Sequence, residues 1–323
     1  MKETINKRDF LKRMAGIGFL LSASSLPAIA EDDPSVFPKR GHYERLSLSY
    51  ATVQIGLKQP FSVLHFSDTH LTAAYPSENE NKRKLQEVRT QTFGGRQEEA
   101  LRDTLAWAKD HVDYLVHTGD LIDWQSEANF DLVKKYFGDQ IFGTMGNHEF
   151  SPNMWLSKEK DTNDERHRAK SRKRLSEVFP FDISIHSQVV HGVNFIGFDD
   201  VYGTVTEKQA ALIKAEFKKG LPVVLCMHVP FYTDNIYRAN NKFWTTRKTY
   251  DFGKPVVPGG EYKKQQEDPA TRDLIQFLKK QPLLKAILSG HLHITVEEKF
   301  SETATQYVIG GNYGFNAREV LFV

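Results

Sequence analysis

The sequence predicts an α/β protein, and three observations lead to that prediction. Short apolar runs typical of buried strands alternate with segments of helical spacing along most of the chain. Polar motifs follow directly after several of these runs, at the strand ends where open α/β sheets bind ligands. A chain of 323 residues, 40% of them hydrophobic, suits one large domain or two small ones with a sizeable core.

The predicted strands are short apolar runs, and most of them end at a polar motif. In chain order they cover residues 61–66, 112–117, 140–145, 193–198, 221–227 and 284–288, followed by closing strands between 295 and 323. Cys226, the one cysteine of the chain, stands in one of these runs, and we expect it to be a small buried core residue. One cysteine cannot form a disulfide within the chain, so the fold does not depend on oxidation.

The predicted helices lie between the strands and carry apolar residues at helical spacing. They cover residues 94–110, 126–137, 206–219 and 269–280. The third has the clearest boundaries, because Thr206 and Gln209 stand at the positions of a capping box and Gly220 follows as a stop signal. In the fourth, Asp268 precedes Pro269, a residue favoured in the first turn of a helix.

Residues 1–30 have the layout of a cleavable export signal. A basic head is followed by an apolar run from Met14 to about Leu26, and Ala28-Ile29-Ala30 offers small residues for cleavage. The apolar run is too short for a permanent membrane span. The head is similar to a twin-arginine signal with Lys7 in place of the first arginine, and the general secretory route is the alternative.

The export signal sets the expected domain organisation and location. We expect a linker at 31–44, which is charged and contains two prolines, and one catalytic domain at 45–323. The protein is then expected to be exported, to the periplasm or outside the cell, with no membrane span after signal removal. Residues 1–30 carry five of the 43 Lys and Arg but only two of the 41 Asp and Glu, so the remaining chain is near neutrality. That balance indicates no nucleic-acid partner.

Five short polar motifs, spread over more than two hundred residues, supply histidines, carboxylates and an amide in excess of structural need. They are Asp68-Thr69-His70, Gly119-Asp120, Gly146-Asn147-His148-Glu149, Met227-His228 and Gly290-His291-Leu292-His293. Each follows a predicted strand, so loops at one sheet edge can bring them to one point. Imidazole, carboxylate and amide groups are together suited to holding two divalent cations over a phosphate ester.

Each motif alone also has an ordinary structural interpretation. Gly119-Asp120 is a common turn sequence, and His228 at the end of an apolar strand is typical of a hydrogen-bonded core histidine. Asn147 suits a loop position in a left-handed conformation, and Glu149 either orients a ligand or faces solvent. The metal-site hypothesis therefore depends on the five motifs occurring together and in this order.

Taken together, the motifs resemble the calcineurin-like metallophosphoesterase family over about residues 61–312. The resemblance implies a four-layer α/β/β/α sandwich with a two-metal site at the strand ends. Carried over by match, it implies a first metal held by Asp68, His70, Asp120 and His293. It implies a second metal held by Asp120 as a bridge, with Asn147, His228 and His291, and it places His148 near the leaving group.

The predicted function is hydrolysis of a small-molecule phosphoester by a hydroxide that two metals share. The ligand set admits Mn, Fe, Zn, Co or Ni. We slightly favour phosphodiesters over phosphomonoesters, because no arginine stands beside a motif to hold a dianion, although Arg96, Arg238 or Arg318 could arrive from loops. The alternative is a non-catalytic metal- or protein-binding module on the same fold, and such descendants normally lose ligands that this chain retains.

Other polar residues and three long connections complete the prediction. Asp123 is expected to support a ligand, Asp199-Asp200 to face solvent in a loop, and four histidines to be structural: His65, His117, His186 and His191. Residues 72–95, 150–174 and 231–268 are expected to be loops around the site. The third holds eight aromatic residues, for which packing onto the domain is favoured over stacking on a substrate sugar or base.

Overall fold

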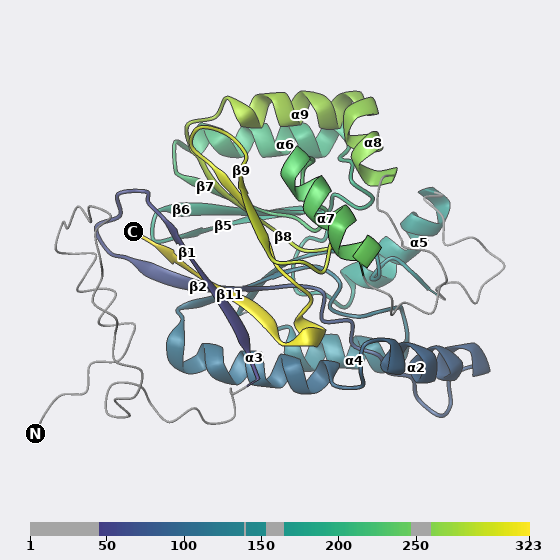
Figure 1. Ribbon diagram of the computed structural model, residues 1–323. Helices are drawn as coiled ribbons and strands as arrows, with labels where there is room; N and C mark the ends of the chain where they lie inside the picture. Colours follow the sequence, from purple (N-terminus) through teal and green to yellow (C-terminus); the bar gives the residue numbers. More distant parts are fainter. Residues whose placement is uncertain (1–44, 139, 153–164, 247–259) are drawn as a thin grey trace, which may run out of the picture.

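The computed structural model describes residues 45–138, 140–152, 165–246 and 260–323 (Figure 1). The predicted export signal at 1–30 and the linker at 31–44 lie outside the described residues. Among the helices that are described, none combines the length and the apolar character needed to cross a bilayer.

Two mixed sheets form the centre of the protein (Figure 1). In the first sheet the strand order is β1-β11-β2-β3-β4, with β2, β3 and β4 parallel and β11 antiparallel to β2. In the second the order is β5-β6-β7-β8-β10-β9, with β6, β7, β8 and β10 parallel. The strands of the first sheet are β1 (Ser47–Val53), β2 (Phe61–Phe66), β3 (Tyr114–Thr118), β4 (Ile141–Thr144) and β11 (Asn316–Phe322). Those of the second are β5 (Ile185–Val190), β6 (Val193–Phe198), β7 (Val223–Cys226), β8 (Leu284–Ser289), β9 (Val296–Lys299) and β10 (Thr305–Val308).

Helices cover the outer face of each sheet, so the protein has four layers (Figure 1). The helices α3 (Gln97–His111) and α4 (Glu127–Tyr136) lie on the outer side of the first sheet. The helices α6 (Glu207–Glu216) and α9 (Pro269–Lys279) lie on the outer side of the second. A cluster of apolar side chains fills the space between the two sheets and includes Cys226, which is buried as expected. The predicted α/β/β/α sandwich is therefore confirmed.

Most predicted element boundaries agree with the structure to within a few residues. Thr206 and Gln209 form the expected capping box at the start of α6. The 3-10 turn that extends α6 ends at Gly220, whose φ of 70° is the left-handed conformation that glycine adopts without strain. The Asp268 side chain caps α9 by accepting the backbone N–H of Thr271. Local sequence signals are sufficient at these positions because the caps are satisfied within four residues.

The three connections predicted to be loops contain helices, and that prediction was wrong. Residues 72–95 include α2 (Glu80–Thr92), 150–174 overlap α5 (Glu165–Ser176), and 231–268 include α7 (Asp234–Thr246) and α8 (Gly260–Glu267). The buried stripe of α2 is made of Lys82, Leu85 and Arg89, so its inward face carries charged residues. A hydrophobic pattern cannot identify such a helix, because two of its three buried positions are polar. The strands β1 and β5 were also not predicted.

Candidate functional site

The seven predicted metal ligands converge from five segments at the C-terminal ends of the strands. These side chains are Asp68 and His70 after β2, Asp120 after β3, Asn147 after β4, His228 after β7, and His291 and His293 after β8. Four of them are buried, and Asn147, His291 and His293 are partly exposed together with His148. The cluster therefore opens to solvent on the side of these four residues.

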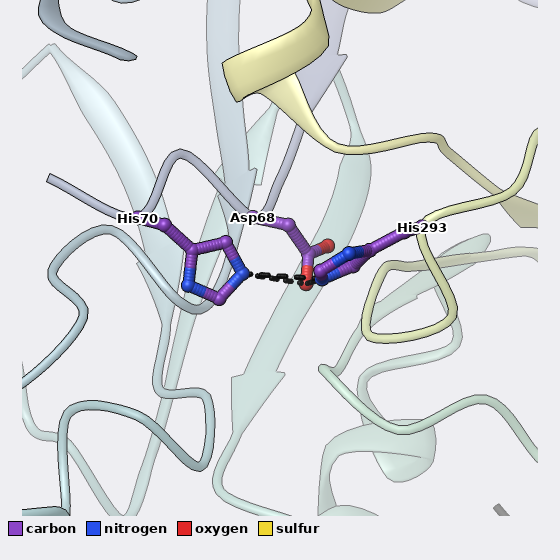
Figure 2. Close-up of side chains that lie close together, drawn as sticks. All are labelled: Asp68, His70 and His293. Atoms are coloured by element: carbon purple, nitrogen blue, oxygen red, sulfur yellow. Dashed lines mark hydrogen bonds and ion pairs between the residues drawn. The ribbon is translucent and has the colours of Figure 1, made fainter. Parts of the chain in front are cut away.

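The first group of ligand atoms is formed by Asp68, His70 and His293 (Figure 2). Asp68 Oδ1 lies 3.2 Å from Nε2 of His293 and 3.9 Å from Nε2 of His70. The two Nε2 atoms lie 3.1 Å apart. Two nitrogens that share one metal at about 2.1 Å are separated by roughly 3–3.5 Å, so the spacing fits one cation.

The second group is formed by Asn147, His228 and His291. Asn147 Oδ1 lies 3.2 Å from Nε2 of His228 and 3.1 Å from Nδ1 of His291. The two nitrogens are themselves 3.2 Å apart. Three ligand atoms at nearly equal separations again describe the corners of a site for one cation.

Asp120 joins the two groups. Its Oδ2 lies 3.8 Å from Nε2 of His70 in the first group and 3.2 Å from Nε2 of His228 in the second. Its Oδ1 accepts the backbone N–H of His148 at 2.9 Å, which fixes the orientation of the carboxylate. A carboxylate with acceptor capacity on both sides can bridge two cations. The geometry therefore matches a bridging position for Asp120.

Hydrogen bonds on the far side of the rings determine which nitrogens face the centre. Nδ1 of His70 donates to Asp123 Oδ1 at 2.8 Å, and Nδ1 of His228 donates to the carbonyl oxygen of Thr118 at 2.7 Å. Both acceptors lack a proton, so each Nδ1 must carry one. Burial and the neighbouring His148 lower the pKa of His70 to about 4, so its Nε2 presents a lone pair. Such inward-facing lone pairs are the donor atoms that a divalent metal requires.

The site contains more buried negative charge than fixed positive charge. Burial lowers the pKa of His228, but Asp120 outweighs burial and raises it to about 10. In the same way, Asp120 and Asp123 outweigh burial and raise the pKa of His148 to about 9. Without a cation these two imidazoles hold protons that balance the carboxylates. Divalent cations would supply the same balance, and the donor set therefore fits a two-metal centre.

His148 and Asp123 lie at the edge of the cluster. Nδ1 of His148 lies 2.8 Å from Asp123 Oδ1, and its Nε2 lies 3.9 Å from Oδ2 of Asp120. The His148 side chain is 16% exposed, whereas Asp123 is fully buried. Asp123 thus contacts both His70 and His148.

Backbone conformation marks the same residues. Seven non-glycine residues in the described ranges have a positive φ, and five of them are predicted ligands: Asp68, His70, Asp120, His291 and His293. This conformation costs roughly 1–3 kcal/mol at each such residue and persists only where the surroundings enforce it. Conformational strain that concentrates on ligand positions is a signature of a functional site.

Two glycines allow the loops to approach closely. A Cβ on Gly146 would overlap the Asp120 carboxylate, and a Cβ on Gly290 would overlap Asp68 Oδ2 and Ser67 Oγ. A glycine at position 146 is therefore required for the Asp120 carboxylate to reach the ligand cluster, and a glycine at position 290 for the Asp68 carboxylate.

Glu149 is buried, which decides between the two interpretations of the sequence. Its carboxylate accepts the backbone N–H groups of Asp120, Leu121, Ile122 and Gly146. Glu149 thus holds the loop that carries Asp120 against the loop that carries Asn147. Glu149 binds the backbone of the predicted ligand Asp120 and does not face solvent.

Asp199 and Asp200 are also buried, so the prediction that they face solvent was wrong. Asp199 Oδ2 pairs with Arg168 at 2.9 Å and Arg172 at 2.7 Å. Asp200 accepts the backbone N–H of His228 at 3.0 Å, and burial raises its pKa to about 7. Their partners come from distant segments, and sequence spacing alone cannot reveal such pairs.

Sequence reasoning missed three residues that contact the site. Tyr313 Oη lies 3.0 Å from Nδ1 of His293, the Phe93 ring stacks on His70 with centroids 4.3 Å apart, and Arg89 pairs with Asp123. Arg89 belongs to α2, which was not predicted, Phe93 is the C-cap residue directly after that helix, and Tyr313 follows the last strand of the second sheet. None of the three stands in a motif, so no sequence signal could have identified them.

Comparison with solved structures gives distant similarities. A dimetal phosphatase from Danio rerio is 14% identical with a TM-score of 0.42, and the match covers 79% of this chain and 88% of that one. A 5'-nucleotidase from Candida albicans is 14% identical with a TM-score of 0.37, over 78% of this chain but 45% of that one. A calcineurin-like phosphoesterase from Bacillus subtilis is 14% identical with a TM-score of 0.35, over 79% and 82%. No curated protein matches the chain.

Comparison with family sequence patterns is more specific. The pattern of the calcineurin-like phosphoesterases matches residues 61–295, which is more than half of the chain and includes all five polar motifs. The matched range also contains every ligand candidate whose geometry is described above. We conclude that this chain belongs to the calcineurin-like phosphoesterase family.

Proposed function

We propose that this protein is a phosphoesterase that uses two divalent metal ions. The observation that carries the proposal is the pair of ligand groups that share Asp120, each with three donor atoms about 3–4 Å apart. Structural histidines satisfy their nitrogens by hydrogen bonds to unlike partners. Here nitrogens of four imidazoles point at one another and at carboxylate or amide oxygens, as metal ligands do.

The proposed ligand assignment follows the two groups. The first ion would be held by Asp68, His70, Asp120 and His293, and the second by Asp120, Asn147, His228 and His291. When bound, the two ions would neutralise phosphoryl charge and activate water, which is most of what phosphoester hydrolysis requires. The metals admitted by this ligand set are Mn, Fe, Zn, Co and Ni.

His148 is proposed to protonate the leaving oxygen of the substrate. Asp123 holds its Nδ1, so Nε2 is directed towards Asp120 and the open side of the cluster. An imidazole that is not needed as a ligand is suited to giving a proton to a departing alkoxide. Its partial exposure lets a small-molecule phosphoester reach it.

We propose a slight preference for phosphodiesters. A monoester dianion needs additional cationic donors, and the three arginines considered from the sequence pair elsewhere. Arg96 binds Glu99, Arg238 binds Asn235 and Arg318 lies 3.6 Å from Glu297.

Export to the periplasm or the extracellular space is also proposed, on the layout of residues 1–30. Fractionation of cells that produce the full chain tests this. A chain that stays in the cytoplasm with its first thirty residues intact would contradict export.

A paired rate assay tests the enzymatic proposal. The protein is stripped of metal, refilled with Mn, Zn, Fe, Co or Ni, and assayed on p-nitrophenyl phosphate and bis-p-nitrophenyl phosphate. We expect metal-dependent turnover, faster on the diester, that is abolished by Asp120→Ala and by His228→Ala. Two bound metals with no turnover on either ester would instead support a non-catalytic binding module. Full turnover in a folded Asp120→Ala variant would reject the two-metal site.

A further inference from the structure

Arg89 is a buried arginine that extends from the last turn of α2 to the edge of the site. Only 6% of the residue is exposed. Its guanidinium binds Asp123 with two nitrogens, Nε to Oδ2 and Nη2 to Oδ1, the second at 2.8 Å. A bidentate pair fixes the plane of the carboxylate as well as its position. Burying an arginine is costly unless its partner compensates, so this pair needs an explanation.

Asp123 in turn contacts two histidine rings that have different proposed roles. Its Oδ1 lies 2.8 Å from Nδ1 of His70 and 2.8 Å from Nδ1 of His148. The rings stand almost perpendicular, at 85°, with centroids 4.6 Å apart. Their Nε2 atoms lie 3.8 Å and 3.9 Å from the same Oδ2 of Asp120. The Asp123 carboxylate therefore contacts both the predicted ligand His70 and the proposed proton donor His148, whose Nδ1 also donates to the main-chain oxygen of Asp123 at 3.1 Å.

A second contact from α2 supports the same arrangement. The Arg89 guanidinium lies over the Phe93 ring, with Cζ 4.7 Å from the centroid. Phe93 in turn stacks on His70 at 4.3 Å with an interplanar angle of 12°. The C-terminal end of α2 therefore reaches His70 in two ways. Phe93 packs on the face of the imidazole ring, and Arg89 binds the Asp123 carboxylate that accepts the proton of Nδ1.

We propose that Arg89 is a positioning residue that, by holding Asp123, aligns His148 with the leaving oxygen and His70 with the first metal. The inference rests on the proposed function, because it assigns Arg89 a task in that reaction. Removal of Arg89 leaves the chemical groups of the site in place but frees the Asp123 carboxylate to rotate. Good leaving groups depart without a proton, so only poor leaving groups should suffer from a misaligned His148.

The test compares leaving groups in the metal-loaded full chain. The variants are Arg89→Gln, Arg89→Lys and the control Lys84→Gln, which removes a cation from the exposed face of the same helix. The substrates are aryl phosphodiesters whose leaving phenols range from p-nitrophenol to phenol. We expect Arg89→Gln to lose roughly tenfold or more rate on the phenyl ester relative to the p-nitrophenyl ester. We expect its affinity for the first metal to fall by about 10–100-fold. Lys84→Gln should match the unmodified protein.

Two outcomes would overturn the inference. The first is an Arg89→Gln variant that loses the same factor in rate on every ester and keeps its metal affinity, because a structural role predicts that result. The second applies if Arg89→Gln does not fold, in which case Arg89→Lys decides, since lysine keeps the charge but cannot bind both oxygens. An Arg89→Lys variant with the same leaving-group dependence and metal affinity as the unmodified protein would then reject the proposal. If the unmodified protein hydrolyses no ester, the proposed function fails, and unchanged metal affinity in Arg89→Lys separately rejects the role of Arg89.

Discussion

Replacing Tyr313 by phenylalanine should weaken one of the two metal positions and leave the other intact. Tyr313 Oη lies 3.0 Å from Nδ1 of His293, whose Nε2 faces Asp68. Phenylalanine keeps the ring, which packs against Phe93 at 4.8 Å and His293 at 5.2 Å, so the change removes a hydrogen bond and little packing. In the second group, the tautomer of His228 is fixed by the main-chain carbonyl of Thr118, which the substitution does not affect.

The magnitude follows from the single bond that is lost. A hydrogen bond between neutral groups contributes about 1 kcal/mol net, which corresponds to roughly a fivefold change in affinity. Bonds that orient a metal-binding imidazole also fix its tautomer, and their loss typically costs about 10–100-fold. We therefore expect the dissociation constant of the first metal in Tyr313→Phe to rise between about fivefold and 100-fold.

Calorimetric titration of the stripped protein with Mn or Zn resolves the two positions. The matched control is Tyr75→Phe, which removes a phenol that binds Asp131 at 2.7 Å. Tyr75 is exposed, and its partner Asp131 lies outside the ligand cluster. If both dissociation constants of Tyr313→Phe stay within twofold of the unmodified protein, Tyr313 does not support a ligand. Equal weakening of both metals would show that the two ligand groups are not independent.

Three further results are expected. Gly290→Ala should lower the bound metal measured by elemental analysis, because the new Cβ would displace Asp68 Oδ2. Metal uptake near neutral pH should release protons and weaken as pH falls. The reason is that His228, whose pKa is about 10 without metal, must lose its proton before it can bind a cation. Calorimetry in buffers of different ionisation enthalpy measures the number of protons released. Burial lowers the pKa of His186, so the folded state binds fewer protons than the unfolded state, and stability should decrease as pH falls below about 6.5. His186→Gln retains a donor for the Gly143 carbonyl and should reduce that pH dependence, as denaturation midpoints at pH 5 and 8 would show; an unchanged dependence would contradict the assignment.

The sequence by itself determined the fold class, most of the strands, the helices α3, α4, α6 and α9, and the five polar motifs. Strands such as Phe61–Phe66 and Val193–Phe198 are buried on every residue, so composition alone reveals them. Cap residues such as Thr206 and Asp268 make their hydrogen bonds within the first turn of their helix. Both kinds of signal are local, and local signals are readable without tertiary structure.

Only the tertiary structure decided how the site is supported. The inward face of α2 carries Arg89, whose burial is favourable only because Asp123 comes from another segment. The same holds for Tyr313 beside His293, and for Asp199, which is buried because Arg168 and Arg172 reach it from α5. A charged residue looks solvent-exposed in a sequence until its partner is known, because burial of charge depends on pairing across the fold. The sequence therefore indicated the candidate ligands and, within or beside the motifs, Asp123 and Glu149, whereas Arg89, Phe93 and Tyr313 contact the site only through the tertiary structure.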